Sequence, residues 1–229
     1  MSHNEKQRVS AVIVAAGSSQ RMDGVDKVFA KLVEKTVLAH VLDTFRKCDF
    51  IDRIIVVLSK QNLERGKRII EEQYKSGSIE VCPGGERRQD SVAAGLNQLE
   101  KCDWVIIHDG ARPLVTVEMI EQGLETAQET GSAIAAVPVT DTIKMAGDDH
   151  IVQGTPPRKN LWAVQTPQIF RFDIIQNAYN QLKYDITDDA RAVEQAGFKV
   201  KIYMASYDNV KITTPDDLAM AEILLRKKV

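Results

Sequence analysis

Four segments of the sequence combine small residues, cations and acids in patterns suited to phosphate chemistry. The first, residues 15–22 (AAGSSQRM), follows a short apolar run, and Lys27 comes five residues later. Small residues let backbone N–H groups approach a phosphate chain, while Arg21 and Lys27 add positive charge. The segment lacks both the GxGxxG fingerprint and the Gly-Lys-Ser/Thr of a P-loop. By itself it fits phosphate binding and an ordinary loop equally well.

The second segment, residues 83–91 (PGGERRQDS), precedes a predicted helix. Its glycines permit a close backbone approach, the Ser91 hydroxyl can donate or accept, and a helix N-terminus favours anions. The alternative is a glycine turn followed by a helix cap at Asp90 or Ser91. Taken alone, the segment favours that alternative.

The third segment, residues 108–113 (HDGARP), closes a predicted buried strand. A carboxylate at the carboxyl end of a central strand, here Asp109, is well placed to hold Mg²⁺ beside substrate phosphates. Arg112 can form a fork to a second phosphate. The alternatives are that Asp109 caps the next segment and that His108 packs in the core, and for His108 we favour packing.

The fourth segment, residues 208–215 (DNVKITTP), places an acid and a lysine ahead of a capped helix. We expect Lys211 to lie in a β run, with its side chain directed toward the first segment. As a lone feature it would be a solvated lysine. Residues 166–168 (TPQ) are predicted to form a turn after a strand.

The joint occurrence of these segments is more informative than any one of them. All four follow predicted strands, so they share one rim of one sheet. Two carboxylates, Asp109 and Asp208, would then face six cations, which are Arg21, Lys27, Arg88, Arg112, Arg158 and Lys211. This set predicts a site for a Mg²⁺-bound polyphosphate and a second phosphate. We find no candidate Ser-His-Asp triad, and no cysteine lies in the four segments.

The elements that must position these residues alternate along most of the chain. Apolar runs predict strands over residues 9–14, 53–58, 79–81, 104–108, 133–137, 162–164 and 199–204. Helical periodicity, caps and closing glycines predict helices over 37–47, 63–74, 90–99, 116–130, 172–182 and 187–196, and from Pro215 onward. The alternation predicts a three-layer α/β fold with a mainly parallel sheet.

The alternation breaks after Pro138. Residues 142–145 and 150–153 predict two short strands joined by AGDD, a hairpin that would project from the sheet as a β-arm over about residues 139–158. The sequence shows no internal repeat, linker or second hydrophobic core. We therefore expect one domain over residues 1–229 with this arm.

Composition sets the class of protein. The chain has 229 residues, 44% of them hydrophobic and 27% charged, as in ordinary globular proteins. A formal charge of −2 gives no global footprint for nucleic acid or an anionic membrane. No apolar run approaches the ~20 residues that a membrane helix requires. Cys48, Cys82 and Cys102 lack CxxC spacing, so we expect reduced thiols in a soluble cytoplasmic protein.

Six motifs, in this order, resemble the 2-C-methyl-D-erythritol 4-phosphate cytidylyltransferases, enzymes of the isoprenoid-precursor pathway through methylerythritol phosphate. They are AAGxxxRM with Lys27, GGxxRxxS (84–91), HDGARP (108–113), PVxDT (138–142), TPQ (166–168) and DNVK (208–211). Together they cover nearly the whole chain, about residues 9–225. The resemblance implies a Rossmann-like nucleotidyltransferase fold, Mg²⁺, CTP as co-substrate, methylerythritol phosphate as acceptor and a homodimer whose β-arms clasp each other.

The resemblance also implies roles for individual residues. It makes Arg21, Lys27 and Lys211 the catalytic cations that neutralise the CTP phosphates and the developing charge, and it assigns Mg²⁺ to Asp109 with Asp208 nearby. The cytidine would be framed by Ala15, Ala16, Gly17, Gly85, Glu86 and Ser91. Methylerythritol phosphate would be held by Asp109, Arg112, Thr142, Arg158 and Thr166, with Thr142 and Arg158 reaching across the dimer.

Three positions depart from the family pattern. Ser19 replaces the usual second glycine of the first loop, Asp26 replaces the proline that often precedes the lysine, and residues 187–191 read TDDAR where TDEAS is common. None of these changes removes a cation or a carboxylate from the expected chemistry.

Rival functions remain open at this stage. A sister cytidylyltransferase for ribitol 5-phosphate usually has Ala-Gly-Gly in the first motif and Ser-Val before the arginine of the third, whereas Ala16-Gly17 and Gly110-Ala111 here favour methylerythritol phosphate. A non-catalytic nucleotide-sensing module would tolerate loss of Lys27, Asp109 or Lys211, and all three are present. A nicotinamide oxidoreductase is disfavoured because the dinucleotide fingerprint is absent.

Overall fold

The computed structural model describes residues 7–17, 26–74, 77–100 and 102–227. Within these residues a seven-stranded sheet has the order β11-β7-β10-β6-β1-β4-β5. Its strands are β1 (Val9–Ala15), β4 (Ile51–Leu58), β5 (Ile79–Pro83), β6 (Trp104–Asp109), β7 (Ser132–Pro138), β10 (Trp162–Arg171) and β11 (Lys201–Met204). Only β10 runs antiparallel to its neighbours, so the predicted mainly parallel sheet is confirmed.

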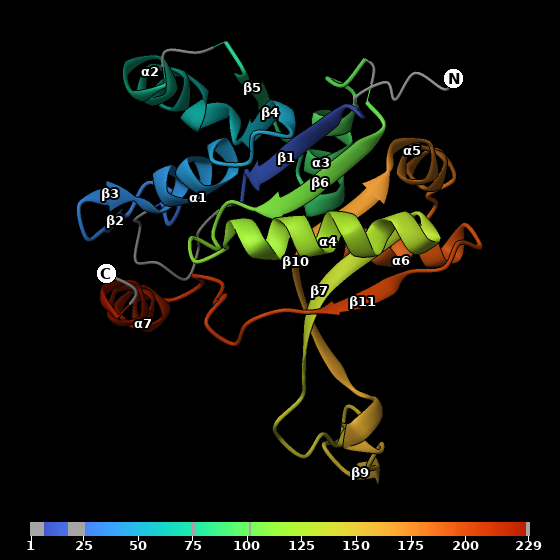
Figure 1. Cartoon of the computed structure of the whole chain (residues 1–229). Helices are drawn as coiled ribbons and strands as arrows, with labels where there is room; N and C mark the ends of the chain where they lie inside the picture. Colours follow the sequence, from blue (N-terminus) through green and yellow to red (C-terminus); the bar gives the residue numbers. More distant parts are fainter. Residues whose placement is uncertain (1–6, 18–25, 75–76, 101, 228–229) are drawn as a thin grey trace.

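Helices cover both faces of this sheet (Figure 1). They are α1 (Val37–Arg46), α2 (Leu63–Gln73), α3 (Arg88–Leu96), α4 (Val117–Thr130), α5 (Phe172–Asn180), α6 (Asp189–Gln195) and α7 (Pro215–Arg226). Two short helical turns, η1 (Lys60–Asn62) and η2 (Arg158–Asn160), and a small hairpin of β2 (Lys31–Leu32) with β3 (Lys35–Thr36) complete this part.

Alternating side chains divide the core into two layers. In β4, Ile54, Val56 and Leu58 pack with α1, α2 and α4 on one face of the sheet. Ile55 and Val57 pack with α3, α5 and α6 on the other face. A strand that is buried on both faces reads as a continuous apolar run, which is why this segment was recognisable in the sequence. The three-layer α/β architecture is confirmed.

Helix ends follow the expected capping chemistry at most positions. The Ala39 N–H donates to Thr36 Oγ1, and Gly131 closes α4 with φ 85°. The helix predicted from Asp90 begins two residues earlier, at Arg88, so neither Asp90 nor Ser91 is its N-cap, although the Asp90 side chain completes a capping box. Arg87 is the N-cap, and its N–H donates to the Asp90 carboxylate at 3.1 Å.

The predicted turn over residues 166–168 is also wrong. These residues lie inside β10, where the Thr166–Pro167 peptide is cis and the pairing with β7 shifts between Val164 and Gln168. A proline has no N–H for the ladder, so a central strand tolerates it only at such an irregularity. Thr166 is thereby held in the sheet, beside β6.

Lys211 does not lie in a strand, contrary to expectation. β11 ends at Met204, and residues 205–214 form an irregular loop that leads to α7. The loop is tied to the end of β6, because the Ile212 N–H donates to the Ala111 carbonyl at 2.8 Å. This bond brings Lys211 to the carboxyl end of the central strands.

The predicted hairpin is present but shorter than expected. Its strands are β8 (Met145–Ala146) and β9 (Val152–Gly154), and Thr142 precedes them. The hairpin projects beyond the ends of β7 and β10, away from the sheet (Figure 1). Among the residues described, no helix is long and apolar enough to cross a lipid bilayer.

Candidate active site

A hollow of about 240 Å³, the first hollow, lies at the carboxyl ends of β1 and β6. The chain order reverses direction at these two strands, which is where open α/β sheets bind ligands. Its lining includes ten residues singled out from the sequence, namely Ala15, Ala16, Gly17, Lys27, Gly85, Glu86, Arg88, Ser91, Asp109 and Lys211. The structure therefore brings the first, second, third and fourth segments to one place.

The glycines of the second segment allow its backbone to approach the first. A Cβ on Gly84 would lie 2.5 Å from Ala16 Cβ and 2.7 Å from Ser91 Oγ, closer than side chains pack. Ser91 is buried, and its hydroxyl oxygen accepts from the Gly85 N–H at 3.2 Å. Any side chain at Gly84 would push these two loops apart and open the floor of the hollow.

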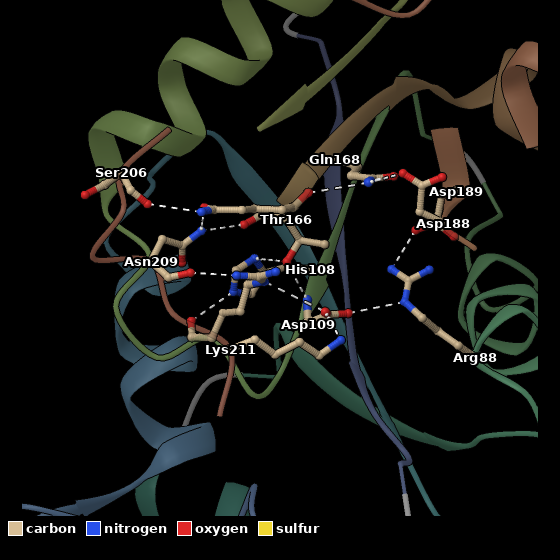
Figure 2. Close-up of polar contacts among 12 residues, drawn as sticks. Arg88, His108, Asp109, Thr166, Gln168, Asp188, Asp189, Ser206, Asn209 and Lys211 are labelled. Atoms are coloured by element: carbon tan, nitrogen blue, oxygen red, sulfur yellow. Dashed lines mark hydrogen bonds and ion pairs between the residues drawn. The ribbon is translucent and has the colours of Figure 1, made fainter. Parts of the chain in front are cut away.

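Asp109 is the electrostatic centre of the site. Its Oδ2 lies 2.6 Å from Lys211 Nζ and 3.9 Å from Arg112 Nε, and its Oδ1 accepts from Arg88 Nε at 3.3 Å (Figure 2). Burial alone would raise the pKa of this carboxyl group. The positive charges of Arg88, Lys211 and Arg112 outweigh burial and hold the pKa of Asp109 well below its usual range.

Thr166 links Asp109 to the buried histidine. Its Oγ1 accepts from the Asp109 N–H at 3.0 Å and lies 3.1 Å from His108 Nδ1. His108 Nε2 lies 3.1 Å from the Arg112 carbonyl, which can only accept. The proton of a neutral ring therefore sits on Nε2, and the threonine hydroxyl donates to Nδ1. His108 is fully buried, as expected for a packed side chain, and burial lowers its pKa to about 4.

Sequence reasoning missed Asn209, although it lies inside the fourth segment. This buried residue donates from Nδ2 to Gln165 Oε1 at 2.8 Å and to the Thr166 carbonyl at 2.9 Å. The backbone carbonyl of Asn209 accepts from Arg112 Nη1 at 2.6 Å. Asn209 thus fastens the loop that carries Lys211 to Thr166 and Arg112. An asparagine in a loop usually indicates a turn, so the sequence offered no sign of this role.

A second hollow, of about 460 Å³, adjoins the first. It is lined by Arg112, Thr166, Gln168 and residues of the segment 187–194. Arg88, Asp109 and Lys211 line both hollows and so form a shared charged wall. A ligand in each hollow would meet the other across this wall.

Several predicted residues are not brought to the hollows. Thr142 and Arg158 are exposed at the projecting hairpin, where Arg158 Nη1 donates to the Thr140 carbonyl at 2.6 Å. Within one chain, the predicted convergence of Arg158 on Asp109 is therefore wrong. Asp208 lies in the 205–214 loop and lines neither hollow. Arg21 lies outside the described residues.

The donor set fits a magnesium ion that arrives with its ligand. Mg²⁺ is commonly held by one or two carboxylates together with substrate phosphates, and Asp109 is a carboxylate that lines both hollows. Within the described ranges, no three His, Cys, Asp or Glu side chains gather into a metal cluster of their own. The residues thus suit a phosphate-bound Mg²⁺ better than a permanent metal.

Comparison with known proteins places this architecture. Residues 9–227 match the family model for 2-C-methyl-D-erythritol 4-phosphate cytidylyltransferase, IspD. A protein of that name from Dehalococcoides mccartyi is 52% identical over 221 residues, covering 96% of this chain and 97% of the relative.

Solved structures agree. The 4-diphosphocytidyl-2C-methyl-D-erythritol synthase of Anaerococcus prevotii superimposes with a TM-score of 0.86 at 32% identity, covering 97% of this chain and all of that one. The 2-C-methyl-D-erythritol 4-phosphate cytidylyltransferase of Thermus thermophilus gives a TM-score of 0.79 at 30% identity, with 96% and 100% covered. The family model, the sequence identities and the shared fold agree, and this chain belongs to the family of 2-C-methyl-D-erythritol 4-phosphate cytidylyltransferases.

Proposed function

We propose that the protein transfers CMP from CTP to 2-C-methyl-D-erythritol 4-phosphate, giving 4-diphosphocytidyl-2-C-methyl-D-erythritol and pyrophosphate. The observation that carries this proposal, beside family membership, is the wall of Arg88, Asp109 and Lys211 shared by two hollows. Two phosphorylated substrates that react with each other need adjoining sites with cations between them.

The first hollow suits CTP. Its small and backbone-lined part would frame the cytidine, through Ala15, Ala16, Gly17, Gly85, Glu86 and Ser91. Lys27 and Lys211 line the same hollow and would neutralise the triphosphate, together with Arg21. Cytosine selection requires an acceptor for its exocyclic amine, which a backbone carbonyl near Gly85 would supply, whereas uracil would set oxygen against oxygen.

The second hollow suits the acceptor. Arg112 and Thr166 line it beside Asp109, where a sugar phosphate would lie next to the α-phosphate of CTP. A phosphate oxygen of the acceptor attacks the α-phosphorus in line, and the bond from that phosphorus to the bridging oxygen breaks. Pyrophosphate leaves with the electron pair. A phosphate dianion needs no general base, so the protein contributes position and positive charge.

Asp109 would hold Mg²⁺ together with the phosphates of CTP. The ion, when bound, supplies positive charge to the triphosphate. Asp208 would contribute only from the neighbouring loop, because it lines neither hollow in the described part of the chain.

The exposed hairpin suits a homodimer. Ile143, Met145, Ile151 and Val152 expose large apolar side chains there, 39–65% accessible, without a cover in the single chain. Clasped arms would bury these side chains and carry Thr142 and Arg158 to the partner's acceptor site. We further take residues 1–229 as one nucleotidyltransferase domain with a β-arm at about 139–158, acting in the cytoplasm.

The direct test is pyrophosphate release from CTP and Mg²⁺, with methylerythritol phosphate and ribitol 5-phosphate offered separately. We expect release with the first acceptor alone. Release with ribitol 5-phosphate alone would keep the chemistry and replace the acceptor. If neither acceptor reacts while CTP with Mg²⁺ still raises the melting temperature and NAD does not, the protein is a nucleotide sensor.

A further inference from the structure

Behind Asp109, a second carboxylate holds Arg88 from the opposite side (Figure 2). Arg88 Nη2 lies 2.8 Å from Asp189 Oδ2, while its Nε points to Asp109 Oδ1 at 3.3 Å. The second oxygen of Asp189 accepts from the Tyr179 hydroxyl at 2.5 Å. The chain Tyr179–Asp189–Arg88–Asp109 therefore leads from the interior between α5 and α6 to the wall between the hollows.

Asp189 has no access of its own to a substrate. Its accessible fraction is 0%, and among the described residues it lines neither hollow. A buried carboxylate is costly unless it is paired and hydrogen-bonded, and here both oxygens are occupied. Any influence of Asp189 on the reaction must therefore pass through Arg88.

The planar guanidinium makes that transmission direct. When Nη2 is fixed by Asp189, the direction of Nε–H is fixed as well, because the five N–H groups of arginine form a rigid fork. The Nε–H then occupies Asp109 Oδ1 and leaves Oδ2 to Lys211. A lysine at position 88 could not bridge both carboxylates in this way.

We propose that Asp189 is a positioning residue that acts through Arg88 to orient the Asp109 carboxylate, and with it Lys211, for the transfer reaction. The inference rests on the proposed function of the site. The alternative is that Asp189 merely anchors the start of α6. An anchor would change stability, whereas a positioning residue also changes turnover at unchanged affinity for CTP.

The test is a double-mutant cycle of Arg88→Lys and Asp189→Asn, with kcat, the KM for CTP and the melting temperature measured for each protein. We expect Asp189→Asn to lower kcat by roughly tenfold or more while the KM for CTP changes less than about threefold. In the Arg88→Lys background the same change should have little further effect, because its route is already broken. Asp173→Asn, which breaks the exposed pair with Arg171, is the matched control and should keep wild-type kcat.

Two outcomes overturn the proposal. One is a folded Asp189→Asn protein with wild-type kcat. The other is a double variant whose loss of kcat equals the product of the losses in the two single variants. If Asp189→Asn does not fold, Tyr179→Phe replaces it, since it loosens the same carboxylate. Tyr179→Phe must likewise lower kcat in the wild-type background and have little further effect in the Arg88→Lys background.

A second measurement separates this proposal from the proposed function. Solvent exchange of the Arg88 Nε–H proton, followed by NMR in the absence of substrate, should be slow in the wild type and faster by about tenfold or more in Asp189→Asn. Unchanged exchange overturns the positioning role even if the enzyme is active. A wild type that releases no pyrophosphate overturns the function and leaves the exchange result to decide the positioning.

Discussion

Lys211 Nζ lies 2.6 Å from Asp109 Oδ2, although the lysine comes from an irregular loop and the aspartate ends a central strand. The carboxylate is almost fully buried, while the lysine side chain is 37% exposed and lines both hollows. The pair therefore holds a partly solvated cation at the point where two phosphates would meet. Its charge is needed there only during the reaction, so its loss should affect turnover far more than folding.

Lys211→Ala tests this directly. We expect kcat to fall by roughly 10²- to 10³-fold, because a cation aimed at the developing charge is lost. The free energy of unfolding should change by less than about 1 kcal/mol, since Arg88 still pairs with Asp109 and Lys211 is partly solvated. Pyrophosphate release and urea unfolding measure the two effects. Lys27→Ala should behave alike.

Lys201→Ala is the control, because Lys201 pairs with Glu129 on the surface at the edge strand β11. Its kcat should equal that of the wild type. Near-normal turnover in Lys211→Ala would remove this lysine from the mechanism.

Thr166→Val tests the link between β10 and Asp109. The substitution keeps the shape but leaves the Asp109 N–H and His108 Nδ1 without their partner, at a cost of about 1–3 kcal/mol in unfolding free energy. Turnover should fall as well, because the Asp109 backbone is no longer fixed. The control is Thr126→Val, which removes an exposed hydroxyl of α4 that donates to the Gln122 carbonyl. It should leave the unfolding free energy and the turnover unchanged. Equal stability of the two variants would contradict the network.

These residues show where sequence reasoning succeeds and where it stops. Segments 15–22, 83–91 and 108–113 were recognisable because glycines, cations and acids after apolar runs mark the carboxyl ends of parallel strands. The fold class followed from the alternation of elements. Asn209 and Asp189 were missed because their roles depend on partners far away in the sequence, Thr166 and Arg88, and nothing local marks such a contact. The strand around Pro167 was missed because proline usually interrupts strands.

Asn209→Ala tests the missed anchor. Loss of its two donated hydrogen bonds should cost about 1–3 kcal/mol and free the loop that carries Lys211. We therefore expect kcat to fall at least about tenfold even under conditions where the protein is fully folded. Circular dichroism checks folding before the assay. Asn177→Ala, on the exposed side of α5, is the control and should keep full activity. Full activity in Asn209→Ala as well would show that the loop needs no anchor.

The buried histidine predicts a pH dependence of stability. Burial lowers the pKa of His108 to about 4, so the unfolded chain takes up a proton below about pH 6.5 while the folded protein does not. Stability contributed by the neutral ring is complete above pH 6.5 and is lost as the pH falls toward 4. From pH 7 to pH 5 the unfolding free energy should drop by about 2 kcal/mol. In His108→Asn the drop, measured by urea unfolding, should be much smaller; an equal drop would assign it to other groups.

Mixing two inactive variants tests whether the β-arm completes the partner's site. Arg158 is exposed at the arm and lines neither hollow of its own chain, so Arg158→Ala should lower kcat by removing a contact to the acceptor in the other subunit. In a mixed dimer with Lys211→Ala, one site then has neither residue and the other site has both. Random exchange should restore about a quarter of wild-type activity, because half of the dimers carry one intact site. If each chain used its own Arg158, every site in the mixture would lack one residue, and no activity would return. The control is a mixture of Lys211→Ala with Thr166→Val, because both residues belong to the site of one chain. Each site of that mixed dimer still carries one substitution, so the activity should not rise above the mean of the two parent variants.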